Sequence, residues 1–278
     1  MSESSWFAAY APVFGAFGAI FGSFLNVCIA RWPKDESVVR PRSRCPGCGG
    51  GIAWYDNIPV VSWLALRGRC RRCGEPISVQ YPLVEAATAA LWVGSLWLLG
   101  PSLLAVRLAV VATILLGVAV TDAQSYLIPD GFTINGLVVA MVGALAGALL
   151  GEQLPFAGPW DAVVGACTGA GAITIIGWLG EVAMKKEAMG YGDATLMAFV
   201  GALLGPVRAL LCIFVGAALA AAAFLLLVYP IVWLRARRSG TAFEPPLVPF
   251  GVFLAPAAVV TLLFGNALLG WYAGRMLG

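Results

Sequence analysis

The sequence predicts an all-α polytopic membrane protein with about eight transmembrane helices and one small domain outside the membrane. Of its 278 residues, 60% are hydrophobic and only 11% are charged, whereas a soluble domain carries roughly a quarter charged residues. Apolar runs recur along most of the chain at the length of about 20 residues that a hydrocarbon core of ~30 Å requires. No run alternates in the way that a barrel strand does, so we expect the spans to be helices.

The apolar runs place the spans along the chain. The first, at 6–30, is too long for the core of a signal peptide, and we expect it to be a retained anchor. The run 194–234 is too long for one crossing, and Gly205-Pro206 lies where a hairpin would turn, so we divide this run into two spans. The remaining spans are predicted at about 82–99, 102–121, 132–150, 161–182 and 248–270.

Lysine and arginine are distributed unevenly between the predicted loops. With the N-terminus outside, the loops 31–81, 122–131, 183–193 and 235–247 face the cytoplasm and hold fourteen of the 17 Lys and Arg residues. This bias is the signal that sets orientation in membranes. We therefore predict three parts: a first transmembrane helix at 1–30, a cytoplasmic domain at 31–81 and a seven-helix membrane core at 82–278.

The cytoplasmic domain contains two Cys-x-x-Cys pairs, Cys45 with Cys48 and Cys70 with Cys73, separated by 21 residues. Four thiolates at this spacing predict one closed tetrahedral zinc site. Disulfides are disfavoured because the predicted compartment is reducing, and a redox role would not need both pairs. Since the segment has few apolar residues, we expect the metal to supply free energy of folding.

The chain contains no histidine, which excludes Ser-His and Cys-His nucleophiles and histidine metal ligands. Any chemistry must therefore use carboxylates, cysteines or lysines, and two carboxylates lie at the predicted membrane boundary. Asp193 follows two glycines, Gly190 and Gly192, and begins a long apolar run. A carboxylate at the mouth of a span is costly and indicates a functional site; the alternative is that Asp193 merely caps the next helix.

A second carboxylate, Asp122, ends the third predicted span, where the helix dipole disfavours a negative charge. Asp130, which precedes the fourth span, is expected to be a helix cap. The predicted topology puts Asp122 and Asp193 at the same membrane boundary. Two carboxylates brought together share a proton, so one can activate water as a base while the other donates a proton.

Several motifs occur in a fixed order along nearly the whole chain. They are Gly22-Ser23-Phe24-Leu25-Asn26-Val27 before a basic turn, the two cysteine pairs, Tyr81-Pro82-Leu83-Val84-Glu85, Asp122 with Ile128-Pro129-Asp130, and Gly190-Tyr191-Gly192-Asp193. Together they resemble the prepilin peptidases, which are type IV leader peptidases of bacterial pilus and type II secretion systems.

The resemblance implies a GxGD aspartyl protease whose catalytic residues would be Asp122 and Asp193, with Gly190 and Gly192 supporting the motif. Such enzymes lie in the bacterial inner membrane and remove the leader of prepilins and pseudopilins at the cytoplasmic face. Members with the full cysteine domain typically also methylate the new N-terminus with S-adenosylmethionine. The expected partners are therefore prepilins and the lipid bilayer, and no nucleic acid is expected.

Two further polar residues keep several interpretations open. Glu85 could orient the substrate, serve methyl transfer, or pair with an arginine of the cysteine domain, while Asn26 could bind substrate or methyl donor or join two helices. The alternative function is a transporter or a non-enzymatic assembly subunit in which Asp122 and Asp193 are ion sites. An inverted repeat would favour a transporter, and the sequence has none that we can find.

Overall fold

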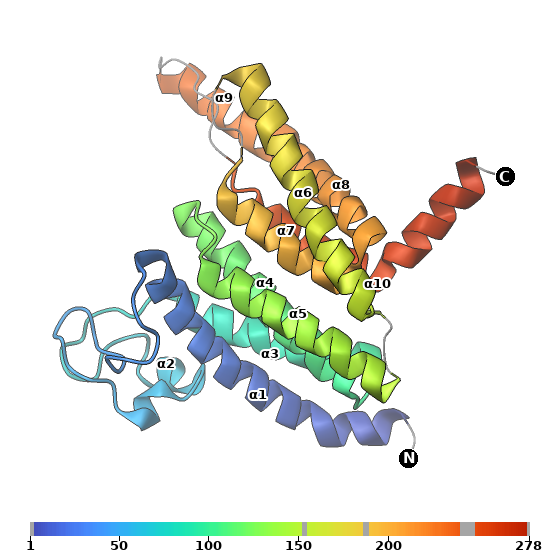
Figure 1. Cartoon of the computed structure of the whole chain (residues 1–278). Coiled ribbons are helices and arrows are strands. Elements are labelled where there is room, and N and C mark those ends of the chain that lie inside the picture. The colour runs from blue at the N-terminus through green and yellow to red at the C-terminus, as the bar shows by residue number, and fades with distance from the viewer. Residues whose placement is uncertain (1–2, 152–154, 186–188, 240–247, 277–278) are drawn as a thin grey trace. The chain divides into compact units, whose positions relative to one another are not determined.

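The computed structural model describes residues 3–151, 155–185, 189–239 and 248–276 (Figure 1). The chain divides into two compact units, Met1–Gly117 and Val118–Gly278. In the described residues the regular secondary structure is helical, apart from two isolated β-bridges in the cysteine domain. The predicted all-α fold is therefore confirmed.

The first unit is built on the close packing of α1 (Glu3–Arg31) against α3 (Gln80–Leu99). A Cβ atom added at Gly18 would lie 2.7 Å from the Cα of Ala89, and one at Gly22 would lie 2.7 Å from the Cα of Glu85. Small residues spaced four apart let two apolar helices approach this closely, as is common in membranes. The glycines of α1 thus bring Glu85 against the end of the first span.

The cysteine domain of the first unit lies between α1 and α3 in the chain. It contains only short helices, at Trp32–Lys34, Trp54–Asn57 and Val61–Ala65 (α2). The two bridges pair Arg44 with Gly51 and Arg69 with Pro76. Each bridge encloses one cysteine pair, so the two halves of the domain repeat the same local structure.

The second unit has α7 at its centre. It comprises the end of α4 (Leu103–Ser125) and the later helices: α5 (Asp130–Leu150), α6 (Pro159–Met184), α7 (Tyr191–Leu204), α8 (Pro206–Ala223), α9 (Tyr229–Ser239) and α10 (Gly251–Met276). α7 contacts α5, α6, α8 and α10, and most of its residues from Leu196 onward are buried. Its backbone lies directly against that of α6, where Gly201 meets Gly165.

Seven helices in the described part of the chain are long and apolar enough to span a membrane. The eighth predicted span is α7, which has 14 residues and is therefore about 21 Å long. It is a short apolar helix that its neighbours cover from Leu196 onward, whereas Tyr191 at its start is exposed. The predicted break at Gly205-Pro206 is confirmed, because α7 ends at Leu204, Gly205 has a φ of +80°, and α8 begins at Pro206.

Candidate active site and metal centre

Asp193 lies in the first turn of α7. Gly190 is the N-cap residue of this helix, and Asp193 reaches back so that its Oδ2 accepts a hydrogen bond of 3.3 Å from the Gly190 amide. The carboxylate is half-buried. The alternative prediction, that Asp193 is itself the cap, is wrong in detail because the residue stands at the third helical position. Its second oxygen remains available for other contacts.

Asp122 lies in the last turn of α4, which continues to Ser125, and only 4% of the residue is exposed. Its Oδ2 accepts a hydrogen bond of 3.1 Å from the Val252 amide, and the neighbouring Gly251 amide faces the same carboxylate. Both amides belong to the first turn of α10. The positive end of the α10 dipole therefore offsets the unfavourable position of this charge at the C-terminal end of α4.

Ile128 connects the surroundings of the two carboxylates. A Cβ atom added at Gly192 would lie 2.9 Å from the Ile128 Cβ, and one at Gly251 would lie 3.0 Å from the Ile128 Cδ1 and 2.9 Å from the Asp122 Oδ2. The structure thus brings both predicted carboxylates to one place in the second unit, at adjoining ends of α4, α7 and α10.

Asp130 was predicted to cap α5, and the structure places it one residue later. Pro129 is the N-cap residue of α5, and the exposed Asp130 is the first helical residue and makes no capping hydrogen bond with its side chain. A carboxylate in the first turn is still favoured by the helix dipole.

Sequence reasoning missed the contribution of Gly251 and Val252. Both donors are backbone amides, so the side-chain pattern carries no direct signal for them. The one indication was a glycine placed two residues after Pro249, at the start of the last apolar run.

The predicted metal ligands come together in the cysteine domain. The Sγ atoms of the four-cysteine cluster lie within 4.8 Å of one another; the cluster is Cys45, Cys48, Cys70 and Cys73. The sulfurs of Cys45 and Cys73 are 3.7 Å apart, close to the edge of about 3.8 Å that a tetrahedral site with Zn–S bonds of about 2.3 Å requires. The four thiols therefore fit a structural zinc ion.

The backbone around the cluster is shaped for a metal. The Gly49 amide bonds to the Cys45 carbonyl and the Gly74 amide to the Cys70 carbonyl, each at 2.9 Å. Both glycines have a positive φ, of 65° and 73°, which glycine adopts without steric cost. Hydrogen bonds from the backbone of Cys73 and Arg72 lower the pKa of the Cys70 thiol to about 6, whereas the pKa of the neighbouring Cys73 thiol is raised to about 12, so the thiols of the cluster titrate together.

An ion pair joins the second cysteine pair to the segment between the pairs. Arg71, which lies inside that pair, donates from Nε and Nη2 to the Asp56 carboxylate at 2.6–3.0 Å. The guanidinium holds the pKa of Asp56 below its usual value. Because the Arg71 side chain is 57% exposed to water, we expect the pair to orient the loop rather than to add much stability.

Glu85 and Asn26 both lie where α1 packs on α3. The Glu85 Oε2 accepts a hydrogen bond of 2.7 Å from the Val60 amide, and the Ser23 side chain also bonds to this carboxylate. The structure records no ion pair between Glu85 and an arginine among the described residues, so the recorded contacts do not support that one of the three interpretations. The Asn26 Nδ2 donates to the Tyr81 carbonyl at 3.0 Å, while its buried Oδ1 has no hydrogen-bond partner among the described residues.

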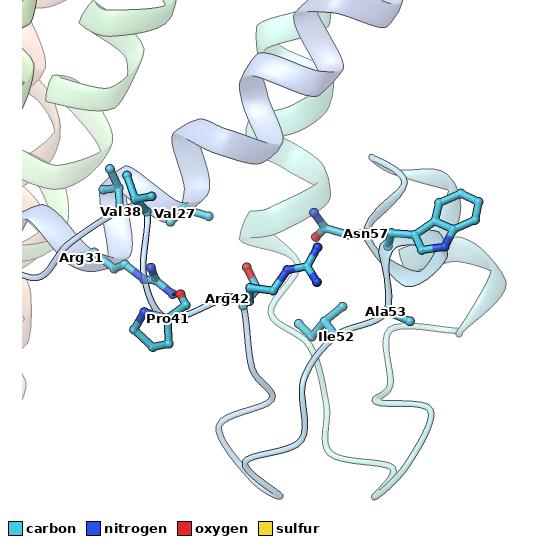
Figure 2. A pocket seen from close by; sticks show the side chains of 11 residues that line it. Val27, Arg31, Val38, Pro41, Arg42, Ile52, Ala53 and Asn57 are labelled. Atoms are coloured by element: carbon cyan, nitrogen blue, oxygen red, sulfur yellow. Dashed lines mark hydrogen bonds between the residues drawn. The ribbon is translucent and has the colours of Figure 1, made fainter.

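The first unit also contains a pocket of about 430 Å³ between the end of α1 and the cysteine domain (Figure 2). Its lining includes Arg31, Arg42 and Trp54 and no acidic side chain. Arg31 is held by the carbonyls of Ser37 and Pro41, at 2.9 and 2.7 Å. The pocket is therefore cationic and suits an anion, whereas the buried acceptors of Glu85 and Asn26 suit a cation.

The helical membrane fold, the adjoining carboxylates and the four-thiol centre define a polytopic membrane protein equipped for acid–base chemistry at helix ends. Comparison with known proteins gives the family. Residues 16–99 match the bacterial peptidase A24 N-terminal domain, and residues 109–226 match the type IV leader peptidase family. The chain belongs to the type IV leader peptidase family.

Relatives named "Prepilin leader peptidase/N-methyltransferase" match most of the chain. The Myxococcus xanthus protein is 42% identical over 208 residues, which are 73% of this chain and 60% of that protein. The Burkholderia pseudomallei protein is 37% identical over 278 residues, covering 90% and 84% of the two chains. The Aeromonas hydrophila protein is 35% identical over 289 residues, covering 94% and 93%.

No solved structure matches the chain significantly. The family assignment does not favour the alternative interpretation as a transporter or a non-enzymatic assembly subunit, because the relatives carry the names of enzymes.

Proposed function

We propose that the protein is a bifunctional enzyme of the bacterial inner membrane. As an aspartyl endopeptidase it removes the leader from type IV prepilins and pseudopilins at the cytoplasmic face, and as an N-methyltransferase it methylates the new N-terminus with S-adenosylmethionine. The peptidase activity rests on one observation above all: Asp122 and Asp193 lie at adjoining helix ends within one unit, with Ile128 between their surroundings.

Hydrolysis by this pair needs no metal and no histidine. One carboxylate takes a proton from a water molecule, whose oxygen bonds to the peptide carbonyl carbon, while the other carboxyl gives its proton to the carbonyl oxygen. The burial of Asp122 and the half-burial of Asp193 restrict water at the site, which strengthens the electrostatic interactions between these groups. Gly192 allows the chain to enter α7 close to Ile128.

The zinc cluster and the methyl donor have roles apart from hydrolysis. Zinc in the four-cysteine cluster stabilises the cytoplasmic domain, whose arginines face anionic lipid headgroups. S-adenosylmethionine supplies an electrophilic methyl group when bound, and it carries a net positive charge. The buried Glu85 carboxylate and the unpartnered Asn26 Oδ1 are suited to hold such a cation, whereas the cationic pocket in Figure 2 is not.

Binding of the methyl donor can be measured apart from catalysis. We expect Glu85→Gln and Asn26→Leu each to weaken binding of S-adenosylmethionine to the purified protein about tenfold, as measured by calorimetry. The first removes the negative charge that would face a buried cation, and the second removes an acceptor for it. Glu36→Gln is the matched control, since Glu36 is exposed. Unchanged affinity in both variants would place the donor elsewhere while leaving the peptidase proposal intact.

The whole proposal is tested by incubating the purified protein with a prepilin, with and without S-adenosylmethionine, and determining the mass of the product's N-terminus. We expect cleavage in both reactions and an added methyl group only with the donor. A pilin supplied already cut should still be methylated by Asp193→Asn, because the acid–base pair serves only hydrolysis. Absence of any cut product from the wild-type enzyme would refute the proposal.

A further inference from the structure

The surroundings of the two carboxylates are unequal. Asp122 is buried and accepts a hydrogen bond of 3.1 Å from the Val252 amide at the start of α10, where the Gly251 amide also faces it. Asp193 is half-buried and accepts one longer bond, of 3.3 Å, from Gly190. Amide donors stabilise a carboxylate more than a neutral carboxyl, because the charged oxygen is the stronger acceptor.

Among the described residues, the recorded hydrogen-bond partners of both carboxylates are backbone amides. The α10 amides and the α10 dipole are therefore the main favourable electrostatic contacts of Asp122. When the pair holds a single proton, the negative charge is therefore more stable on Asp122, beside the amide donors, and the proton is more stable on Asp193.

We propose that the first turn of α10 is part of the catalytic arrangement: the amides of Gly251 and Val252 position Asp122 and keep it ionised, so that Asp122 is the base and Asp193 the acid. This inference rests on the proposed peptidase function and deepens it. Gly251 and Val252 are positioning residues, because they act through Asp122 and do not touch the peptide.

The assignment gives a balanced reaction. Asp122 takes a proton from water, the water oxygen bonds to the carbonyl carbon, and the proton of Asp193 moves to the carbonyl oxygen. As the C–N bond then breaks, the leaving nitrogen takes the proton held by Asp122, and a hydroxyl of the intermediate returns a proton to Asp193. The pair ends in its starting state, with Asp122 ionised.

The geometry explains why residue 251 is glycine. A Cβ atom there would lie 2.9 Å from the Asp122 Oδ2 and 3.0 Å from the Ile128 Cδ1. Ile128 in turn lies against Gly192, one residue before Asp193. A methyl group at 251 would therefore push the base off its donors and press Ile128 toward the acid.

We expect Gly251→Ala to lower kcat for prepilin cleavage about 100-fold with KM nearly unchanged, because a displacement of about 1 Å at a reacting group has an effect of that size. Gly270→Ala is the matched control on the same helix, where an added Cβ meets nothing within 4 Å, and it should cleave normally. Adding Ile128→Val to Gly251→Ala removes the Ile128 Cδ1 and should recover part of the lost kcat.

A second variant tests the donors without adding bulk at 251. Val252→Pro removes the amide that bonds to Asp122, at a position in the first helical turn where proline is tolerated, and it should also lower kcat. If Gly251→Ala and Val252→Pro both retain wild-type kcat while Asp122→Asn is inactive, the role of α10 is wrong and the proposed function stands. Full activity of Asp122→Asn would instead overturn the proposed function itself.

Discussion

Asparagine in place of either Asp122 or Asp193 is expected to lower the rate of prepilin cleavage about 10²–10⁴-fold, the contribution typical of general acid–base catalysis. Asparagine has nearly the same shape as aspartate and can still accept the backbone hydrogen bonds, from Val252 at one site and from Gly190 at the other. It cannot exchange a proton with the substrate. The loss should therefore appear in turnover and not in membrane insertion.

Asp130→Asn is the matched control for this loss. Asp130 is exposed in the first turn of α5 and its side chain caps nothing, so its variant should retain most of the activity. Cleavage by purified variants in detergent or nanodiscs, followed over time on gels, measures all three. Wild-type turnover in either Asp122→Asn or Asp193→Asn would remove that residue from the catalytic pair.

Much of the membrane fold could be predicted because the signals lie along the chain itself. Apolar runs of spanning length gave the helices, and Gly205-Pro206 gave the break before α8, since the pair combines a positive φ with the loss of an amide donor. The cysteine spacing predicted the metal cluster for a similar reason, because each pair closes a local turn and only the pairing of the two turns is non-local.

The donors to Asp122 could not be predicted in this way. Val252 is 130 residues from Asp122 in the chain and bonds to it through its backbone, so no side chain signals the contact. Glu85 shows the same limit: its partner is the amide of Val60, a residue with a φ of +61°, where an arginine was one of the expected partners. The local sequence pattern identifies carboxylates that need a hydrogen-bond donor, whereas the tertiary structure decides which backbone amide donates to each of them.

Loss of the four-cysteine cluster should have the second large effect. We expect Cys45→Ser and Cys73→Ser to lose bound zinc and to make residues 31–80 sensitive to protease, because structural zinc contributes about 10–16 kcal/mol of apparent binding free energy to small domains of this kind. Metal analysis of the wild-type protein should give about one zinc per chain. Cys167→Ser is the matched control, since Cys167 is exposed and lies outside the cluster.

The same variants should separate the two activities. Val60, which bonds to Glu85, belongs to the segment between the two cysteine pairs, so unfolding of this segment removes a contact that positions the Glu85 carboxylate. Asp122 and Asp193 belong to the second unit and keep their own hydrogen bonds. Methylation of a pilin supplied already cut should therefore fall more in Cys45→Ser than prepilin cleavage does, as measured by transfer of a labelled methyl group. An ordered, metal-free domain, or equal losses of both activities, would contradict this link between zinc, Val60 and Glu85.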